Sequence, residues 1–394
     1  MPSPGTQEAM ALMAGFAERT GLSAERPRRR YLWTDAFAVC NLLGLARETG
    51  EGRFVRLALQ LVDQVHHTLG RHREDDRRTG WISGLGERNG ETHPTLGGLR
   101  IGKELPERGA DEPFDERLEW DRDGQYFHYL TKWMHALDQL ARATGQSRFS
   151  IWARELAQTA HRAFTYLPAE GATARRMYWK MSIDLSRPLV HSMGQHDPLD
   201  GYVTCLQLRA TARALQGEAG GPDLDGETRS FAAMLDAGQW ASGDPLGIGG
   251  LLTDAWRVEL LMRERALSDP NLLEALLTAA LAGLQHYARS DEHRLPADYR
   301  LAFRELGLAI GLRAVERLGK ALDGTSPQSA ASPQVRARLE GLRRYTALGA
   351  AIEAFWRDAA NRSSPTWSEH RDINEVMLAT SLAPEGFLER APPR

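Results

Sequence analysis

Apolar residues recur along most of this chain at i, i+3, i+4 and i+7, the spacing that puts them on one face of an α-helix. No segment alternates apolar and polar residues for long enough to indicate a half-buried strand. The pattern therefore predicts about a dozen helices and no strands. Their predicted spans are 5–19, 33–48, 52–70, 124–143, 148–165, 199–216, 226–238, 248–266, 270–289, 298–319, 334–360 and 371–381.

Two short sequences occur twice. Residues 45–54 read LARETGEGRF and residues 140–149 read LARATGQSRF, so a helical pattern twice ends in Thr-Gly and resumes at Arg-Phe. The glycine is the residue expected in the left-handed conformation that closes a helix. The second pair, HDPLDG and GDPLGI, puts Asp197 and Asp244 before proline at the start of an apolar run. This order predicts an aspartate N-cap followed by proline in the first helical turn.

The predicted helices are joined alternately by short and long links. The links within hairpins are brief, whereas 71–123 and 166–198 are long, polar and contain tryptophan and glycine. Solenoid repeats are regular in length, so this variation favours a closed ring whose long loops build a site. We predict one all-α domain, residues 1–394, folded as an (α/α)6 toroid or barrel of about twelve helices in six hairpins.

The hairpin number, the Thr-Gly turns and the aromatic-rich long links resemble the six-hairpin glycosidase superfamily, which includes the N-acylglucosamine 2-epimerase-like sugar isomerases. The resemblance covers most of the chain, and no motif assigns it to one family. It implies a saccharide site at the N-terminal ends of the inner helices, which we predict to start near 33, 124, 199, 248, 298 and 371. Fold alone does not fix function, so the residues in these places must be considered individually.

Composition narrows the partners. The net charge is −3 and basic residues are scattered, which argues against nucleic-acid binding. No apolar run reaches the ~20 residues of a membrane span, and the N-terminus lacks the features of a signal peptide. Cys40 and Cys205 lie in apolar helical patterns and are expected to be buried free thiols. We therefore expect a cytoplasmic protein without membrane or nucleic-acid partners, and the sequence leaves a homodimer open.

Site-like residues concentrate in LEWDRDGQYFHY at 118–129 and in the long link that precedes the 199–216 helix. Tryptophans of the long links, such as Trp81, are expected in a site because core tryptophans would lie within helices. Sugars stack on aromatic rings, and their hydroxyls pair with carboxylates, Arg and His. The expected substrate-binding residues are Trp33, Asp35, Glu119, Trp120, Tyr126, His128, Trp179, Arg187, His191, His196, Asp200, Trp240, Trp367 and His370.

Glycosidic cleavage requires a protonated carboxyl group and a second carboxylate. The candidate catalytic acids are Asp121, Asp123, Asp184 and Asp197. One of the acids in 118–129, Asp123 beside Gly124, is expected to cap the following helix, which leaves Glu119 and Asp121 without a structural role. The spacing of these acids mimics a calcium loop, but Leu130 replaces the bidentate acid at the twelfth position. We expect no metal and no cofactor.

Three functions remain open. The first is a glycoside hydrolase that acts on an oligosaccharide or glycoside through paired carboxylates. The second is a sugar epimerase or isomerase, in which a histidine pair would remove and return a proton. Its candidates are His128, His191, His196 and His370. The third is a non-catalytic saccharide-binding or scaffold protein, which would keep the aromatic surface without an acid of perturbed pKa.

Overall fold

The computed structural model describes residues 2–169, 175–191, 196–215, 220–323 and 332–392. They fall into two compact units. Unit 1 comprises Met1–Phe16 and Asp236–Glu389, and unit 2 comprises Ala17–Leu235 and Arg390–Arg394. Helix α1 (Pro4–Arg19) begins in unit 1. No helix in the described part of the chain is both long and apolar enough to cross a membrane.

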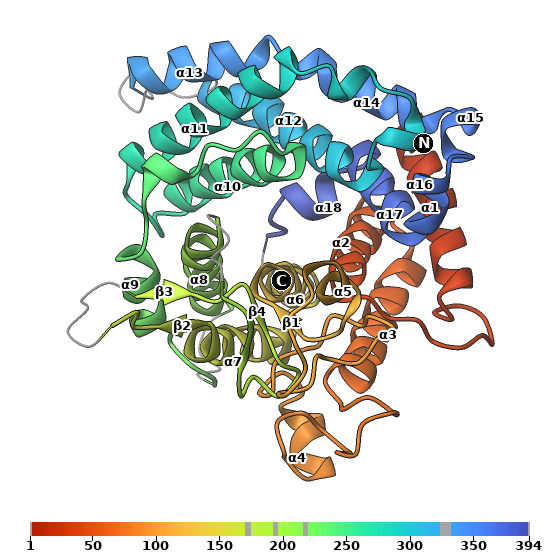
Figure 1. The fold of residues 1–394 in the computed structure, drawn as a ribbon. Helices are drawn as coiled ribbons and strands as arrows, with labels where there is room; N and C mark the ends of the chain where they lie inside the picture. Colours follow the sequence, from red (N-terminus) through yellow and green to blue (C-terminus); the bar gives the residue numbers. More distant parts are fainter. Residues whose placement is uncertain (1, 170–174, 192–195, 216–219, 324–331, 393–394) are drawn as a thin grey trace. The chain divides into compact units, whose positions relative to one another are not determined.

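In unit 2, three helices are buried on nearly all sides: α2 (Leu32–Thr49), α6 (Phe127–Thr144) and α8 (Asp197–Ala214) (Figure 1). In α2, every residue from Leu32 to Leu45 is buried. Helices α3 (Gly52–Leu69), α7 (Ser147–Phe164) and α9 (Asp225–Ala232) instead bury one face and expose the other. Helices buried all round form the inside of a layered α structure, and amphipathic helices cover them. The helix pairs α2–α3, α6–α7 and α8–α9 pack against each other.

The repeated hairpin turn is confirmed. Gly50 and Gly145 both close their helices in the left-handed region, with φ values of 74° and 69°. The preceding threonines make the same bonds, because the Thr49 and Thr144 hydroxyls each donate to the carbonyl four residues earlier at 2.7 Å. Each hydroxyl also accepts the backbone N–H two residues later, at 3.2 Å and 3.4 Å. Identical local chemistry thus produces both turns.

Unit 1 has the same two kinds of helix. Helices α10 (Pro245–Arg263), α12 (Ala302–Asp323) and α17 (Arg371–Leu382) are largely buried, and α11 (Pro270–Arg289), α13 (Pro333–Arg343) and α14 (Thr346–Arg357) are amphipathic. Short helices follow as α15 (Ala359–Arg362), α16 (Pro365–Glu369) and α18 (Glu385–Leu388), with 3-10 turns at Ala237–Gln239, Glu292–Arg294 and Ala297–Tyr299. The close packing of α10 on α12 requires glycine, since a Cβ at Gly249 would lie 2.1 Å from the carbonyl oxygen of Gly307.

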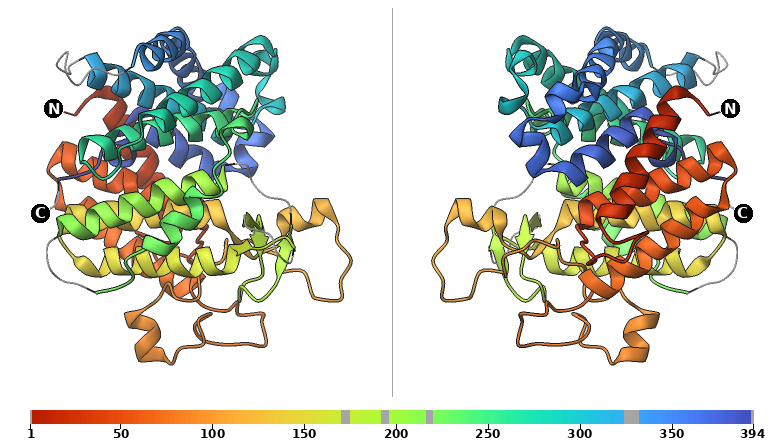
Figure 2. Two further views of the ribbon diagram at one scale, coloured as in Figure 1. Left: turned by 90° about the vertical axis from the view of Figure 1, so that its left-hand side faces the viewer. Right: turned by 90° about the vertical axis from the view of Figure 1, so that its right-hand side faces the viewer.

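The prediction of no strands is wrong for the long links of unit 2. Strands β1 (Gln125–Tyr126), β4 (Lys180–Met181) and β5 (Pro188–Val190) form an antiparallel sheet, and β2 (Thr165–Tyr166) pairs with β3 (Arg176–Met177). Strands of two or three residues are too short to show alternation. The link after α3 also contains α4 (Glu87–Thr92) and α5 (Glu116–Asp121), which extend from the main body of unit 2 in Figure 2.

Several predicted boundaries need correction. The 334–360 span is two helices, α13 and α14, because the chain turns at Arg344 and Tyr345. The helix predicted from 298 starts only at Ala302, after a separate 3-10 turn, and the helix predicted from 124 starts at Phe127 because β1 precedes it. The apolar pattern predicted the long helices and missed these breaks and later starts.

Candidate functional site

An aromatic cluster lies at the N-terminal ends of α2 and α6 in unit 2; its members are Tyr31, Trp33, Trp120, Tyr126, His128, Tyr129 and Trp179. Trp179 joins its parts. The ring centroid of Trp179 is 4.9 Å from that of Trp120 and 5.2 Å from that of Tyr126. His128 stacks on Trp179 with an interplanar angle of 16°. Trp120 is 45% exposed whereas Tyr126 is buried, so the cluster extends from the interior to the surface.

The base of the aromatic cluster is formed by α2. Trp33 packs against Tyr129 at 5.3 Å between centroids, and the hydroxyl groups of Tyr31 and Tyr129 are hydrogen-bonded at 2.7 Å. Trp33 is buried, and its indole N–H has no hydrogen-bond partner among the described residues. A buried donor without an acceptor is unfavourable, so this N–H can pair with an oxygen that the chain does not supply.

A buried ion pair between Lys180 and Glu119 packs against the aromatic cluster. Lys180 is fully buried, and its ammonium group donates to the Glu119 carboxylate at 2.9 Å and to the backbone carbonyls of Glu119 and Arg122. Glu119 also accepts from the Arg108 guanidinium at 3.0 Å. The expectation that Glu119 has no structural role is therefore wrong. It holds α5 onto β4, and the Lys180 ammonium lies 5.5 Å from the ring centroid of Tyr126.

A second lysine faces the same ring. The Lys103 ammonium lies 6.0 Å from the centroid of Tyr126 and, within the described chain, makes no hydrogen bond. Burial, followed by the nearby Lys180 charge, lowers the pKa of Lys103 to about 8, although Asp121, Asp123 and Glu119 act in the opposite direction. A partly uncharged amine therefore lies against the aromatic cluster at neutral to mildly alkaline pH.

We expect Lys103 to react with an amine-acylating reagent at pH 8 faster than Lys132, whose ammonium group is held by Asp200 at 2.7 Å. Only the uncharged amine reacts, and a pKa of about 8 makes about half of Lys103 available at that pH. Peptide mass spectrometry of timed labelling measures both rates. Lys103→Arg is the control for peptide assignment. A labelling rate for Lys103 that still climbs steeply above pH 9 would contradict the lowered pKa.

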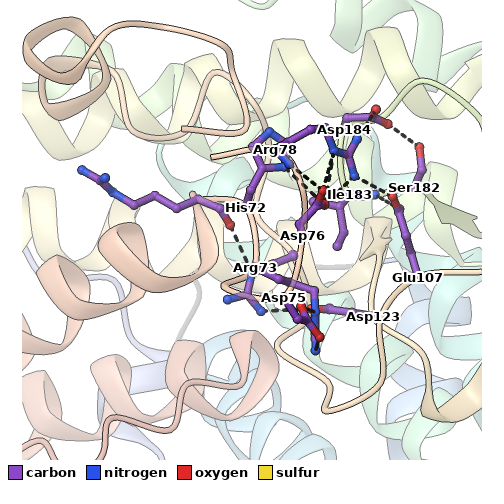
Figure 3. Close-up of polar contacts among 12 residues, drawn as sticks. His72, Arg73, Asp75, Asp76, Arg78, Glu107, Asp123, Ser182, Ile183 and Asp184 are labelled. Carbon is purple, nitrogen blue, oxygen red and sulfur yellow. Dashed lines mark hydrogen bonds and ion pairs between the residues drawn. The ribbon is translucent and has the colours of Figure 1, made fainter. Parts of the chain in front are cut away.

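Two of the predicted catalytic acids belong to an ion-pair network between the long links (Figure 3). Asp123 is fully buried and accepts from the guanidinium groups of Arg73 and Arg100 at 3.3 Å and 3.0 Å. Its other oxygen accepts the backbone N–H groups of Gly102 and Gly124 at 3.0 Å. The sequence predicted that Asp123 caps α6, and this is wrong. The helix starts three residues later than expected, at Phe127. Asp123 fastens the first long link to β1.

Asp184 belongs to the other half of this network. The Arg78 guanidinium contacts the Asp184 carboxylate at 2.6 Å. It also contacts Asp76 at 2.7 Å and Glu107 at 2.9 Å (Figure 3). Burial acts to raise the pKa of Asp184, but hydrogen bonds from Ser186 and Ser182 and the charge of Arg78 lower it to about 2. A carboxyl group with so low a pKa is ionised at neutral pH and cannot donate a proton.

Asp197 has the opposite environment. It is the first residue of α8 and does not cap the helix, because the N-cap position belongs to His196. Asp244, by contrast, caps α10 as predicted, accepting the Gly247 N–H at 3.0 Å. Burial, and then the neighbouring Asp200 carboxylate, raise the pKa of Asp197 well above its usual value, while Lys132 acts against this. One carboxyl oxygen of Asp197 has no hydrogen-bond partner within the described chain.

Helix α6 links the Asp197–Asp200 pair to the aromatic cluster. Lys132 follows His128 by one turn, and its ammonium group contacts Asp200. Thr131 donates a second hydrogen bond to the same oxygen of Asp200. The second turn of α6 and the start of α8 thus bring together a paired carboxylate, Asp200, and a buried carboxyl group with a raised pKa, Asp197.

No protein-family model and no curated protein matches this chain. Solved structures do. It is similar to an inactive variant of an α-1,6-mannanase of Salegentibacter, in complex with α-1,6-mannotetrose, with a TM-score of 0.55 and 10% identity. That match covers 97% of this chain and 99% of that one. A glycoside hydrolase family 76 α-mannanase of Bacteroides thetaiotaomicron matches with a TM-score of 0.52 and 9% identity over 97% and 96% of the two chains. The chain has the six-hairpin (α/α)6 fold.

Three further residues that the sequence predicted to bind substrate lie outside the aromatic cluster and the Asp197–Asp200 pair. Asp35 forms a buried ion pair with Arg30 at 3.3 Å and accepts the Tyr31 N–H, which fixes the start of α2. The Arg187 guanidinium donates to the backbone carbonyl of Arg108. His191 is exposed and lies edge-on to Tyr178. These three residues fix or border the long links.

Most tryptophans of the long links belong to the core, contrary to expectation. Trp81, Trp240 and Trp367 are all buried. In unit 1, Trp367 stacks on Trp356 at 5.7 Å between centroids, and His370 is exposed beside Phe303. Loops this long must carry their own apolar anchors, so tryptophan in a loop is a weak indicator of a site.

Sequence reasoning missed Lys103, Lys132 and Tyr31 as members of the site. One signal could have identified the lysines: the 49 basic residues include lysine at only four positions, 103, 132, 180 and 320. Three of them lie at the aromatic cluster or at the Asp197–Asp200 pair. In so arginine-rich a sequence, lysine marks places where a compact ammonium group fits and a planar guanidinium does not.

Proposed function

We propose that this chain is a glycoside hydrolase in which the aromatic cluster binds the sugar and Asp197 donates a proton to the leaving oxygen. The observation that carries the proposal is the buried carboxyl group of Asp197, which has a raised pKa and one oxygen without a partner in the described chain, beside the Lys132–Asp200 pair. A general acid must hold its proton at the working pH, and burial next to a like charge achieves this. Asp200 is then a positioning residue, because its charge keeps the proton on Asp197.

We propose Asp121 as the second carboxylate, which activates water. Asp123 and Asp184 are each held by arginine, whereas Asp121 is exposed at the end of α5, next to Trp120, and makes no ion pair within the described chain. A base that receives a proton from water needs open access to solvent and to the sugar. Glu119, Trp120, Tyr126, His128 and Trp179 would position the substrate, directly or by holding the aromatic cluster in place.

The mannanase comparison suggests the first substrates to test. The variant of the Salegentibacter enzyme that is described as inactive lacks two adjacent aspartates. The only adjacent aspartates of this chain are Asp75 and Asp76. They lie in the link after α3 and are paired with Arg73 and Arg78. We therefore propose that the acid function here has moved to α8, and that α-1,6-linked mannosides are the first of several glycans to examine.

A sugar epimerase remains the second candidate, and one observation favours it. His128 stacks on Trp179 within the aromatic cluster, where an imidazole could exchange a proton with a bound sugar. Solvent deuterium uptake into the substrate distinguishes the two. Epimerisation through His128 would incorporate deuterium at carbon and would be lost in His128→Asn.

We further infer that the protein works in a reducing compartment such as the cytoplasm. Cys40 in α2 and Cys205 in α8 are both buried, and both are free thiols. Buried unpaired cysteines are typical of proteins that fold where disulfides are rare.

The decisive experiment is a panel of glycans with mass-spectrometric detection of products. It begins with α-1,6-mannotetraose and continues through other neutral α- and β-linked oligosaccharides. We expect shortened products with one water added, and their loss in Asp197→Asn but not in Asp291→Asn, a matched change at an exposed acid of unit 1. Turnover that is equal in both variants would refute the role of Asp197.

Trp179→Ala is expected to weaken substrate binding more than it slows the chemical step. Removing the ring takes away the stacking surface that joins Trp120, Tyr126 and His128. We expect KM to rise roughly ten-fold with a smaller change in kcat, because a stacking contact acts on the bound sugar before and during reaction. Steady-state kinetics on the best glycan measures both. An unchanged KM would contradict the proposal that the aromatic cluster binds the substrate.

A further inference from the structure

A cavity of about 430 Å³ lies in unit 1, and none of the residues assigned above to catalysis lines it. It is bounded by the start of α10, the end of α11 and the connection that leads into α12. Its lining includes Asp244, His286, Glu292, Tyr299, Arg304 and Glu305. We propose that this cavity binds a neutral saccharide, as a second carbohydrate site of the protein.

The inner wall of the cavity is rigid. Glu305 is buried and accepts from Nε and Nη2 of the Arg300 guanidinium, at 2.8 Å and 2.7 Å. The Trp356 indole N–H donates to the same carboxylate at 2.7 Å, and the Tyr287 hydroxyl donates at 3.4 Å. Arg300 in turn lies 3.7 Å from the ring centroid of Phe355. A network satisfied on every side keeps its shape, so the cavity is preformed.

The outer wall carries groups that are free to meet a ligand. Tyr299 is 76% exposed, the most exposed large hydrophobic side chain among the described residues. It ends a 3-10 turn, and its backbone is fixed by the bonds from Tyr299 N–H to Pro296 and from Arg300 N–H to Ala297. An exposed aromatic ring on a hydrogen-bonded turn at the edge of this cavity is a surface on which a sugar ring can stack.

Polar groups beside that ring suit sugar hydroxyls. The Arg304 guanidinium contacts the Asp244 carboxylate at 2.5 Å. The two side chains are 40% and 34% exposed, so a ligand can reach both. This pair offers donors and acceptors side by side, as a vicinal diol requires. Ser290 and His286 line the same cavity and add further hydrogen-bonding groups.

The charge balance of the lining argues against other ligands. Asp244, Glu292 and Glu305 oppose Arg300 and Arg304, so the cavity has no excess positive charge for phosphate or for an acidic sugar. Both arginines are already paired with carboxylates. An apolar segment would find more polar groups than it could satisfy. A neutral polyol with one apolar face fits this lining best, and the inference does not depend on the activity proposed for unit 2.

The test measures how accessible the Tyr299 side chain is to a reagent in the 394-residue chain. Acetylation of Tyr299 by N-acetylimidazole is measured by peptide mass spectrometry with and without α-1,6-mannotetraose, cellotetraose, maltotetraose, a tetragalacturonate and inorganic phosphate. We expect at least one neutral tetrasaccharide to protect Tyr299 saturably, and neither the acidic sugar nor phosphate to do so. The protection should persist in Trp179→Ala, which disables the aromatic cluster of unit 2 without touching this cavity.

Variants then connect protection to affinity. In the Trp179→Ala background, calorimetry with the protecting sugar should give a roughly three- to ten-fold weaker Kd for Tyr299→Ala, since one stacking contact is lost. Tyr299→Phe keeps the ring and should bind as before. Arg294→Ala, on the same connection but outside the lining, should also bind as before. Absence of protection by every neutral sugar, or protection by phosphate or tetragalacturonate alone, would overturn the proposal. Failure of glycan turnover in unit 2 would leave these results unaffected.

Discussion

Asp197→Asn is expected to lower kcat/KM for the cleaved glycan by about 10²–10⁴-fold, the range that a positioned general acid contributes. Asparagine keeps the shape of the side chain and removes the proton that must be donated. The same variant should unfold at pH 7 at an unchanged or higher temperature. The reason is that burial beside Asp200 raises the pKa of Asp197, so the fold disfavours its charged form, and asparagine carries no charge.

The pH dependence of stability gives the sign of this effect. The pKa of Asp197 is raised in the folded state above its ordinary 3.8. As the pH increases from about 3.8 towards the raised value, the unfolded chain loses this proton first, so the wild-type protein loses stability over that window. Asp197→Asn should not show this part of the decline. Thermal unfolding from pH 4 to 8 compares the two proteins, with Asp291→Asn as the exposed control. A variant that unfolds earlier than wild type at pH 7 would contradict a buried neutral carboxyl group.

Glu119→Gln is expected to lower the free energy of unfolding by about 3–5 kcal/mol, the cost of leaving one partner of a buried ion pair unpaired. The Glu119 carboxylate lies between the Lys180 ammonium at 2.9 Å and the Arg108 guanidinium at 3.0 Å. The side chain of Lys180 is 0% exposed, so its charge has no access to water when Glu119 is neutral. Urea-induced unfolding followed by circular dichroism measures the change.

Asp121→Asn, two residues later, is the matched control. Asp121 is exposed and unpaired within the described chain, so its replacement should change stability by less than about 0.5 kcal/mol. The double variant Glu119→Gln/Lys180→Met removes both charges and should regain much of the stability that Glu119→Gln loses. Equal, small effects of Glu119→Gln and Asp121→Asn would mean that the ion pair does not hold α5.

The three carboxylates of LEWDRDGQYFHY, Glu119, Asp121 and Asp123, show what local sequence can and cannot predict. The sequence predicts that this stretch opens an inner helix, and α6 does begin within it, at Phe127 and not at residue 124. Which acid has a structural partner depended on segments far along the chain. Glu119 meets Lys180 across 61 positions, and Arg78 meets Asp184 across 106. The course of a long link between helices leaves no periodic trace, so these pairs could not be deduced from spacing.

The all-α class, the repeated hairpin turn and the Asp244 cap could be predicted from the sequence alone, because each depends on contacts within a few residues along one helix or turn. The resemblance also pointed to the correct six-hairpin fold, which the similarity to solved structures supports over nearly the whole chain. The surroundings of the individual carboxyl groups came from folding. Asp123 and Asp197 look alike in the sequence, each beside a turn that opens a helix. One lies among two arginines and two N–H groups, and the other is buried next to a like charge. Protonation is set by burial and by charges that folding brings together, which neighbouring residues in the sequence do not reveal.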